Sequence, residues 1–142
     1  MGALMGAHVV AVTPPGKFSV KEEVIKRAEN LAKSTGGKIE ISHDVNAVKD
    51  ASVLYTDVWL SMGDSESERS ERIKALTPYA VTEELMELAL KDAIFMHCLP
   101  AHRGEEVAAS VIDGGRSVVW QQAFHRRTTI QALLYHLTRG DL

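Results

Sequence analysis

The stretch His97-Cys98-Leu99-Pro100-Ala101-His102-Arg103-Gly104 decides how the whole chain is interpreted. It follows a short apolar run at residues 93–96, which is typical of a buried strand. A thiol, two imidazoles, a guanidinium and a proline therefore stand where that strand ends. In an open parallel α/β sheet, ligands bind at the carboxyl ends of the strands. The stretch predicts a functional site at the end of a central strand.

Outward from this point, apolar runs of strand length alternate with helical patterns. Strands are expected at residues 8–13, 38–42, 52–56, 93–97 and 117–120. Helices are expected at residues 19–32, 44–50, 82–90, 105–111 and 123–137, the first opened by a capping box at Ser19 and Glu22. This alternation predicts a single α/β domain, a Rossmann-like three-layer sandwich with a five-stranded parallel sheet and helices on both faces.

The composition is that of an ordinary globular protein. The chain has 142 residues, 45% of them hydrophobic and 25% charged, with a formal net charge of −3. A small charge of mixed sign argues against nucleic-acid binding, and no apolar run approaches the length that crosses a bilayer. A single cysteine excludes an internal disulfide and fits a reducing compartment. We therefore expect a cytoplasmic protein.

The sequence supports neither of two possible anion-binding motifs. Pro14-Pro15-Gly16 follows the first strand in place of a glycine-rich dinucleotide loop, so nucleotide binding is unsupported. Ser67-Glu68-Arg69-Ser70 superficially resembles a phosphate-gripping turn, but the surrounding carboxylates would repel an anion. The polar run at residues 64–72 is expected to be a solvated loop or the start of an exposed helix.

Cys98 admits three interpretations from its neighbours alone. A lone cysteine at a strand end is most often a small buried residue. A thiol nucleophile would need a base, which only closeness in sequence nominates as His97 or His102. The same three residues could bind zinc, although their spacing matches no common site and adjacent strand residues point to opposite faces. By default, Asp57 is a turn residue and Arg126 a surface charge.

Three motifs together carry a family resemblance. The stretch from His97 through Val107 resembles the His-Cys-Leu-Pro signature of ornithine carbamoyltransferases. Thr56-Asp57-Val58-Trp59-Leu60-Ser61-Met62-Gly63 resembles the ornithine-binding loop of that family, and Arg126 matches its late arginine. The motifs occur in the family's order and spacing, and the resemblance covers essentially the whole chain but only the second half of the enzyme.

The resemblance implies attack by the δ-amine of L-ornithine on carbamoyl phosphate, giving citrulline and phosphate without a cofactor or metal. Asp57 would accept hydrogen bonds from the α-ammonium of ornithine, a charge-assisted contact. Ser61 and Met62 would complete the amino-acid clamp. The resemblance implies a cis bond before Pro100, with Cys98 beside the δ-amine and the Leu99 carbonyl against the carbamoyl group. Cys98 and Arg126 would be the catalytic residues, Arg126 facing carbamoyl phosphate.

The same resemblance implies that residues 1–142 form an isolated C-terminal, ornithine-binding domain. The N-terminal carbamoyl-phosphate domain, which carries the family's phosphate loop, would be absent, and the chain alone is expected to be inactive. One departure concerns the late arginine: Phe124-His125-Arg126 stands where the family typically has Glu-Asn-Arg. Because of this change, the orientation of Arg126 is not expected to follow from the resemblance alone.

Two other hypotheses remain open at this stage. One is a non-catalytic structural or interaction domain that associates with itself or a partner through the last helix. That helix carries apolar residues that need covering: Ile130, Leu133, Leu134 and Leu137. The other is a thiol enzyme that uses Cys98, whose activity the substitution Cys98→Ser would abolish.

Overall fold

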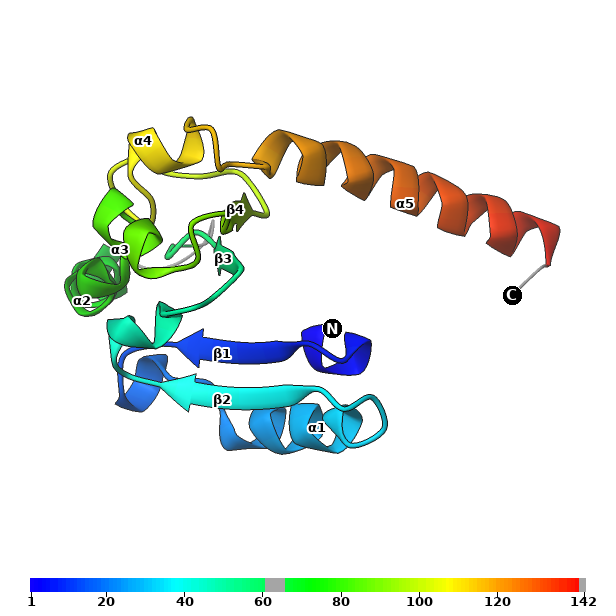
Figure 1. The fold of residues 1–142 in the computed structure, drawn as a ribbon, viewed down its shortest axis with the longest axis horizontal. Coiled ribbons are helices and arrows are strands. Elements are labelled where there is room, and N and C mark those ends of the chain that lie inside the picture. The colour runs from blue at the N-terminus through cyan, green and yellow to red at the C-terminus, as the bar shows by residue number, and fades with distance from the viewer. Residues whose placement is uncertain (61–65, 141–142) are drawn as a thin grey trace. The chain divides into compact units, whose positions relative to one another are not determined.

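The computed structural model describes residues 1–60 and 66–140 (Figure 1). The elements in chain order are η1 Gly2–Met5, β1 His8–Val12, η2 Gly16–Phe18, α1 Glu22–Ala32, β2 Lys38–Ser42, η3 Val45–Val48, β3 Val53–Thr56, α2 Glu66–Leu76, η4 Thr77–Tyr79, α3 Glu83–Leu88, β4 Ile94–His97, α4 Ala109–Ile112 and α5 Val119–Arg139. Among these described helices, none is both long and apolar enough to cross a membrane. The chain divides into two compact units, residues 1–50 with 59–80 and residues 51–58 with 81–142.

The first unit is built on a parallel pair of strands. β1 and β2 pair in register from His8 opposite Lys38 to Val12 opposite Ser42. The crossover between them contains α1, as parallel strands require. A glycine is needed where the chain returns from α1 to β2, since a Cβ at Gly37 would lie 2.6 Å from the carbonyl oxygen of Ala3. The predicted strands and the stop after α1 are confirmed.

The second unit is built on the other parallel pair. β3 and β4 pair from Val53 opposite Ile94 to Thr56 opposite His97. Thr82 caps α3 by accepting a hydrogen bond from the Leu85 amide at 3.3 Å, as its position before two glutamates predicts. The core of this unit is apolar and its members lie on every strand and helix of the unit: Leu54, Val81, Met86, Phe95, Val107, Val111, Ile112 and Val119.

The predicted five-stranded sheet is wrong. The described residues form four strands in two separate two-stranded parallel sheets. The expected last strand, residues 117–120, contributes one isolated bridge between Ser117 and Phe95, and α5 already begins at Val119. A short apolar run fits a buried strand and a buried helix end equally well by periodicity. Val119 is fully buried on the helix, so its apolar character did not require a strand.

Two local predictions also need correction. The expected capping box at Ser19 is absent: Lys21 is the N-cap of α1 and has no side-chain cap bond, while Ser19 ends η2. The helix expected over residues 105–111 is only the short α4, because the preceding residues form bridges of Val107 with Val81 and with Arg103. The polar run at residues 64–72 was expected to be a solvated loop or the start of an exposed helix, and the second alternative is confirmed from Glu66 onward, where α2 begins.

Candidate functional site

The register of β3 and β4 brings Asp57 and Cys98 together. Thr56 and His97 are paired as the last residues of the two parallel strands, so the residues that follow them leave the sheet at one edge. The Cys98 thiol donates a hydrogen bond of 2.8 Å to Oδ1 of Asp57. The Val58 amide donates to the same oxygen at 2.7 Å and fixes the carboxylate. The two side chains, far apart in sequence, therefore meet where their strands end.

The environment of the thiol favours its neutral form. Partial burial raises the pKa of Cys98, and the hydrogen bond to Asp57 and the charge of that carboxylate raise it further. A hydrogen bond from Tyr55 opposes these effects by lowering the pKa. A nucleophilic cysteine requires a thiolate, which a positive neighbour promotes and a carboxylate disfavours. This electrostatic setting argues against the thiol-enzyme hypothesis.

Arg126 lies at the same edge. It stands on the second turn of α5 and its Nη1 donates to the Cys98 carbonyl at 3.4 Å. The guanidinium is exposed, so it can turn to an anion placed over this edge. The Phe124-His125 pair beside it stacks edge to face at 5.6 Å between ring centroids. The changed neighbours of Arg126 therefore pack on each other, while the arginine still reaches Cys98.

The backbone after Cys98 turns sharply. The peptide bond between Leu99 and Pro100 is cis, as the resemblance implies. Leu99 has a φ of 56°, in the left-handed region that non-glycine residues rarely adopt. The Leu99 amide donates to Nδ1 of His97 at 2.8 Å, and this bond holds the unusual conformation.

His97 and Glu106 form a buried pair beneath the site. Both side chains are fully buried, and Nε2 of His97 lies 3.2 Å from Oε1 of Glu106. Because Nδ1 of His97 accepts from Leu99, the ring proton belongs on Nε2 and is donated to the carboxylate. The His102 amide donates to the same Glu106 oxygen at 2.6 Å. Glu106 thus ties the end of β4 to the loop that follows it.

The zinc hypothesis for His97, Cys98 and His102 loses its support. Both ring nitrogens of His97 already have partners, and its side chain lies in the core while the thiol faces Asp57. Within residues 1–60 and 66–140, ligand atoms close enough to hold a metal ion come from His102, Glu105 and Glu106, all within 4.8 Å of one another.

Two polar residues at this edge were missed by the sequence analysis. Tyr55 precedes Asp57 by two residues and so lies on the same face of its strand, a signal that strand alternation offered. Gln122 bridges the two strands, since its Oε1 accepts from the His97 amide at 3.1 Å and its Nε2 donates to the Tyr55 hydroxyl at 3.2 Å. No sequence signal could have found Gln122, because its reach depends on where α5 begins.

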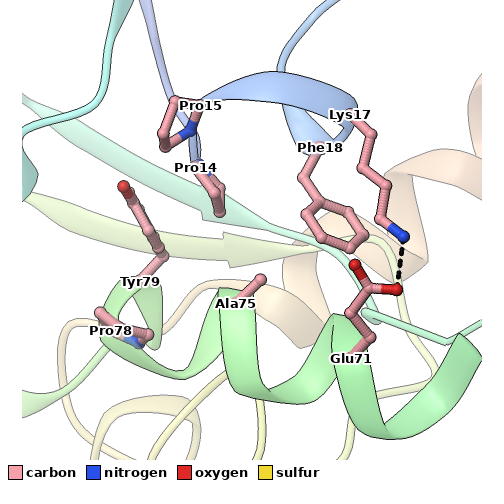
Figure 2. Close-up of a pocket in the computed structure, with 8 residues that line it drawn as sticks. All are labelled: Pro14, Pro15, Lys17, Phe18, Glu71, Ala75, Pro78 and Tyr79. Carbon is pink, nitrogen blue, oxygen red and sulfur yellow. Dashed lines mark hydrogen bonds and ion pairs between the residues drawn. The ribbon is translucent and has the colours of Figure 1, made fainter.

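Ser61 and Met62 lie outside the described residues. The hollow shown in Figure 2, of about 510 Å³, lies within the first unit and contains none of the predicted site residues. Its walls are Pro14, Pro15, Lys17, Phe18, Glu71, Ala75, Pro78 and Tyr79. Lys17 pairs with Glu71 at 2.5 Å and lies over the Phe18 ring. These charges are satisfied by each other, so the hollow offers mainly apolar and aromatic walls.

Comparison with known proteins agrees with the sequence motifs. Residues 1–137 match the family described as aspartate/ornithine carbamoyltransferase, Asp/Orn binding domain. The chain belongs to this carbamoyltransferase family. The anabolic ornithine carbamoyltransferase of Pyrococcus furiosus is 52% identical over 134 residues, which cover 94% of this chain and 42% of that protein. The enzyme of Pyrococcus abyssi is 51% identical over 140 residues, covering 98% of this chain and 44% of its own.

Solved structures of carbamoyltransferases share the fold. The structure of the P. furiosus ornithine carbamoyltransferase matches with a TM-score of 0.85 over 93% of this chain and 42% of its own. The anabolic enzyme of Campylobacter jejuni, 34% identical, matches with a TM-score of 0.88 over 98% of this chain and 46% of its own. The chain spans less than half the length of these carbamoyltransferases and corresponds to their Asp/Orn-binding domain. The predicted family is confirmed.

Proposed function

We propose that this chain supplies the ornithine-binding half of an ornithine carbamoyltransferase site. The complete reaction would join carbamoyl phosphate and L-ornithine to give citrulline and phosphate. The proposal depends on one observation: Asp57, Cys98 and Arg126 meet at the carboxyl-terminal ends of β3 and β4. The Cys98 thiol lies 2.8 Å from Oδ1 of Asp57, and Nη1 of Arg126 lies 3.4 Å from the Cys98 carbonyl oxygen. These three residues lie in the motifs that resemble those of the family.

Each of these groups has a chemical task in the proposed reaction. The exposed Asp57 carboxylate, fixed by the Val58 amide, accepts the α-ammonium of ornithine. The neutral Cys98 thiol lies beside the δ-amine, which must lose a proton to attack. The Leu99 carbonyl contacts the carbamoyl group, and Arg126 stabilises the negative charge that develops on carbamoyl phosphate. Ser61 and Met62 complete the clamp on the amino acid.

The chain alone should bind ornithine weakly and should not catalyse the transfer. Holding two reactants together in the right geometry contributes roughly 7–11 kcal/mol to a bimolecular reaction, and half a site cannot provide it. In this proposal the other half of the site belongs to an N-terminal carbamoyl-phosphate domain of the complete enzyme. That domain would also supply the surface against which carbamoyl phosphate binds.

Ornithine binding is tested by titrating the chain with L-ornithine and following amide chemical shifts. We expect saturable binding with a Kd of roughly millimolar order, corresponding to about −4 kcal/mol. Asp57→Asn should abolish the shifts, whereas Asp92→Asn, an exposed carboxylate in the same unit, should leave them unchanged. Shifts that are absent in the parent, or that persist in Asp57→Asn, would contradict the proposed role. Rapid citrulline formation by the purified chain would contradict its expected inactivity.

A second candidate function is a non-catalytic interaction domain. The observation in its favour is the exposure of large apolar side chains along α5, each at least 46% exposed: Phe124, Ile130, Leu133, Leu134 and Leu137. Apolar surface of this extent marks an interaction site. Light scattering separates the two candidates, because an obligate interaction domain should self-associate at micromolar concentration, whereas a monodisperse monomer that binds ornithine supports the first.

A further inference from the structure

The two carboxylate oxygens of Glu106 have unequal surroundings. Oε1 accepts from Nε2 of His97 at 3.2 Å and from the His102 amide at 2.6 Å. Oε2 is buried and makes no hydrogen bond to any residue that the structure describes. A buried carboxylate oxygen is normally paired with a donor or bound to a metal ion. Protonation does not remove this requirement, because the hydroxyl so formed would in turn need an acceptor.

Two further side chains bring ligand atoms beside this oxygen. Nδ1 of His102 lies 3.9 Å from Oε2 of Glu106, which is too far for a hydrogen bond. Atoms of His102, Glu105 and Glu106 that can bind a metal all lie within 4.8 Å of one another. In a tetrahedral zinc site, with bonds of about 2.0–2.2 Å, two ligand atoms lie about 3.4 Å apart. Because His102 is exposed and Glu105 is only partly buried, rotation of their side chains can close the remaining gap.

The backbone that carries these side chains is held in a tight turn. The Glu105 amide donates to the His102 carbonyl at 3.0 Å, and the Gly104 amide donates to the Val107 carbonyl at 2.8 Å. Gly104 has a φ of 86°, which glycine adopts without strain. The turn therefore keeps residues that are three and four positions apart within reach of one ion.

We propose that Nδ1 of His102, one carboxylate oxygen of Glu105 and Oε2 of Glu106 bind one Zn²⁺ ion. The two carboxylates balance the charge of the ion, and water completes the tetrahedral set. An imidazole beside two carboxylates favours Zn²⁺ over Mg²⁺, which prefers oxygen ligands in an octahedral arrangement. His97 supports the site from behind, because its bond to Oε1 orients the Glu106 carboxylate. The ion takes no part in the carbamoyl transfer proposed above, so zinc binding and ornithine binding can be measured separately.

The test titrates the chain with Zn²⁺ itself, in competition with a chromophoric chelator and without ornithine. We expect one equivalent to bind with a Kd of roughly micromolar order. His102→Ala and Glu105→Gln should each raise that Kd at least about tenfold, because loss of even a residue behind a metal ligand typically weakens binding about 10- to 100-fold. Zn²⁺ should also raise the urea midpoint of the parent and not that of either variant, since a ligand stabilises only the state that binds it. An equal concentration of Mg²⁺ should not compete.

Glu106→Gln tests the unbonded oxygen directly. The amide oxygen can still accept from His97 and His102, which places the amide nitrogen where Oε2 lies. That nitrogen can only donate, so zinc binding should weaken as much as in His102→Ala. Urea unfolding without zinc shows whether this variant folds. If it does not, His102→Ala and Glu105→Gln, which leave the buried carboxylate in place, provide the test.

Three control variants should bind zinc as the parent does. His125→Ala and Glu83→Gln are matched controls, since they remove the same groups at exposed positions of the same unit. Cys98→Ser removes the single thiol of the chain, which is another possible zinc ligand.

Any of four results would overturn the proposed zinc site. They are no binding by the parent at roughly 100 μM Zn²⁺, loss of binding in Cys98→Ser but not in His102→Ala, equal weakening in the matched controls, and equal competition by Mg²⁺. A parent chain that binds zinc but not ornithine would contradict only the proposed function, and one that binds ornithine but not zinc would contradict only this site.

Discussion

The Cys98 thiol donates a 2.8 Å hydrogen bond to the Asp57 carboxylate, although 41 residues separate them in sequence. The bond exists because each residue directly follows the last paired position of its strand. Parallel pairing thus places a carboxylate beside a neutral thiol. Arg126, reaching the Cys98 carbonyl from α5, brings the positive charge to the same edge.

Replacing Asp57 by Asn should make the thiol more acidic. The hydrogen bond to Asp57 and its charge both raise the pKa of Cys98, so removal of the charge should lower that pKa. Alkylation of Cys98 at pH 7.5 should then accelerate by roughly three- to tenfold. Asp92→Asn serves as the control. Unchanged or slower alkylation in Asp57→Asn would show that the carboxylate does not govern the thiol.

Asp113→Asn should destabilise the chain in a pH-dependent way. Arg103 donates two hydrogen bonds to the Asp113 carboxylate, from Nε at 2.8 Å and from Nη2 at 2.7 Å. This contact lowers the pKa of Asp113 below its ordinary value of 3.8. A carboxylate with a lowered pKa stabilises the fold above its unfolded pKa and loses that contribution as the pH falls through its folded pKa. The free energies of unfolding of the two proteins in urea should therefore differ at pH 6, and the difference should shrink as the pH falls below 3.8. A difference that is independent of pH would contradict the ion-pair explanation.

Glu106→Ala should be strongly destabilising, by about 2–4 kcal/mol, because it leaves two donors without their acceptor, one of them fully buried and the other partly buried. These donors are Nε2 of His97 and the His102 amide, both bonded to Oε1 of Glu106. Glu106→Gln retains an oxygen at that position and should cost clearly less. Denaturant unfolding at pH 7 measures both variants, and equal losses would mean that the oxygen contributes little.

Phe95→Ala should lower the free energy of unfolding by about 3–5 kcal/mol, since it leaves a cavity in the apolar core of the second unit. Phe95 is fully buried, whereas Phe124 on α5 is 53% exposed. Phe124→Ala makes the same chemical change at the surface and should alter the unfolding free energy by no more than about 0.5 kcal/mol. Comparable losses at the two positions would place Phe124 in a packed environment.

Much of the local structure was determined by the sequence. Alternating and continuous apolar runs located β1, β2, β3 and β4 because each pattern is set by residues adjacent in the chain. Thr82 with its following glutamates located the start of α3 for the same reason. The residues around Cys98, Asp57 and Arg126 were also sufficient to predict the family that the comparisons confirm.

What the sequence did not determine depends on contacts between distant residues. The run at Val118, Val119 and Trp120 is compatible with strand or helix, and packing of Val119 in the core decided for α5. Glu106 looks like a surface residue in sequence, yet its burial depends on His97 nine positions away. Gln122 reaches His97 and Tyr55 only because α5 starts where it does. Local periodicity depends on residues that are adjacent in sequence, whereas the pairing of polar groups depends on the folded chain. The site is made of such pairings, so only the tertiary structure decided it.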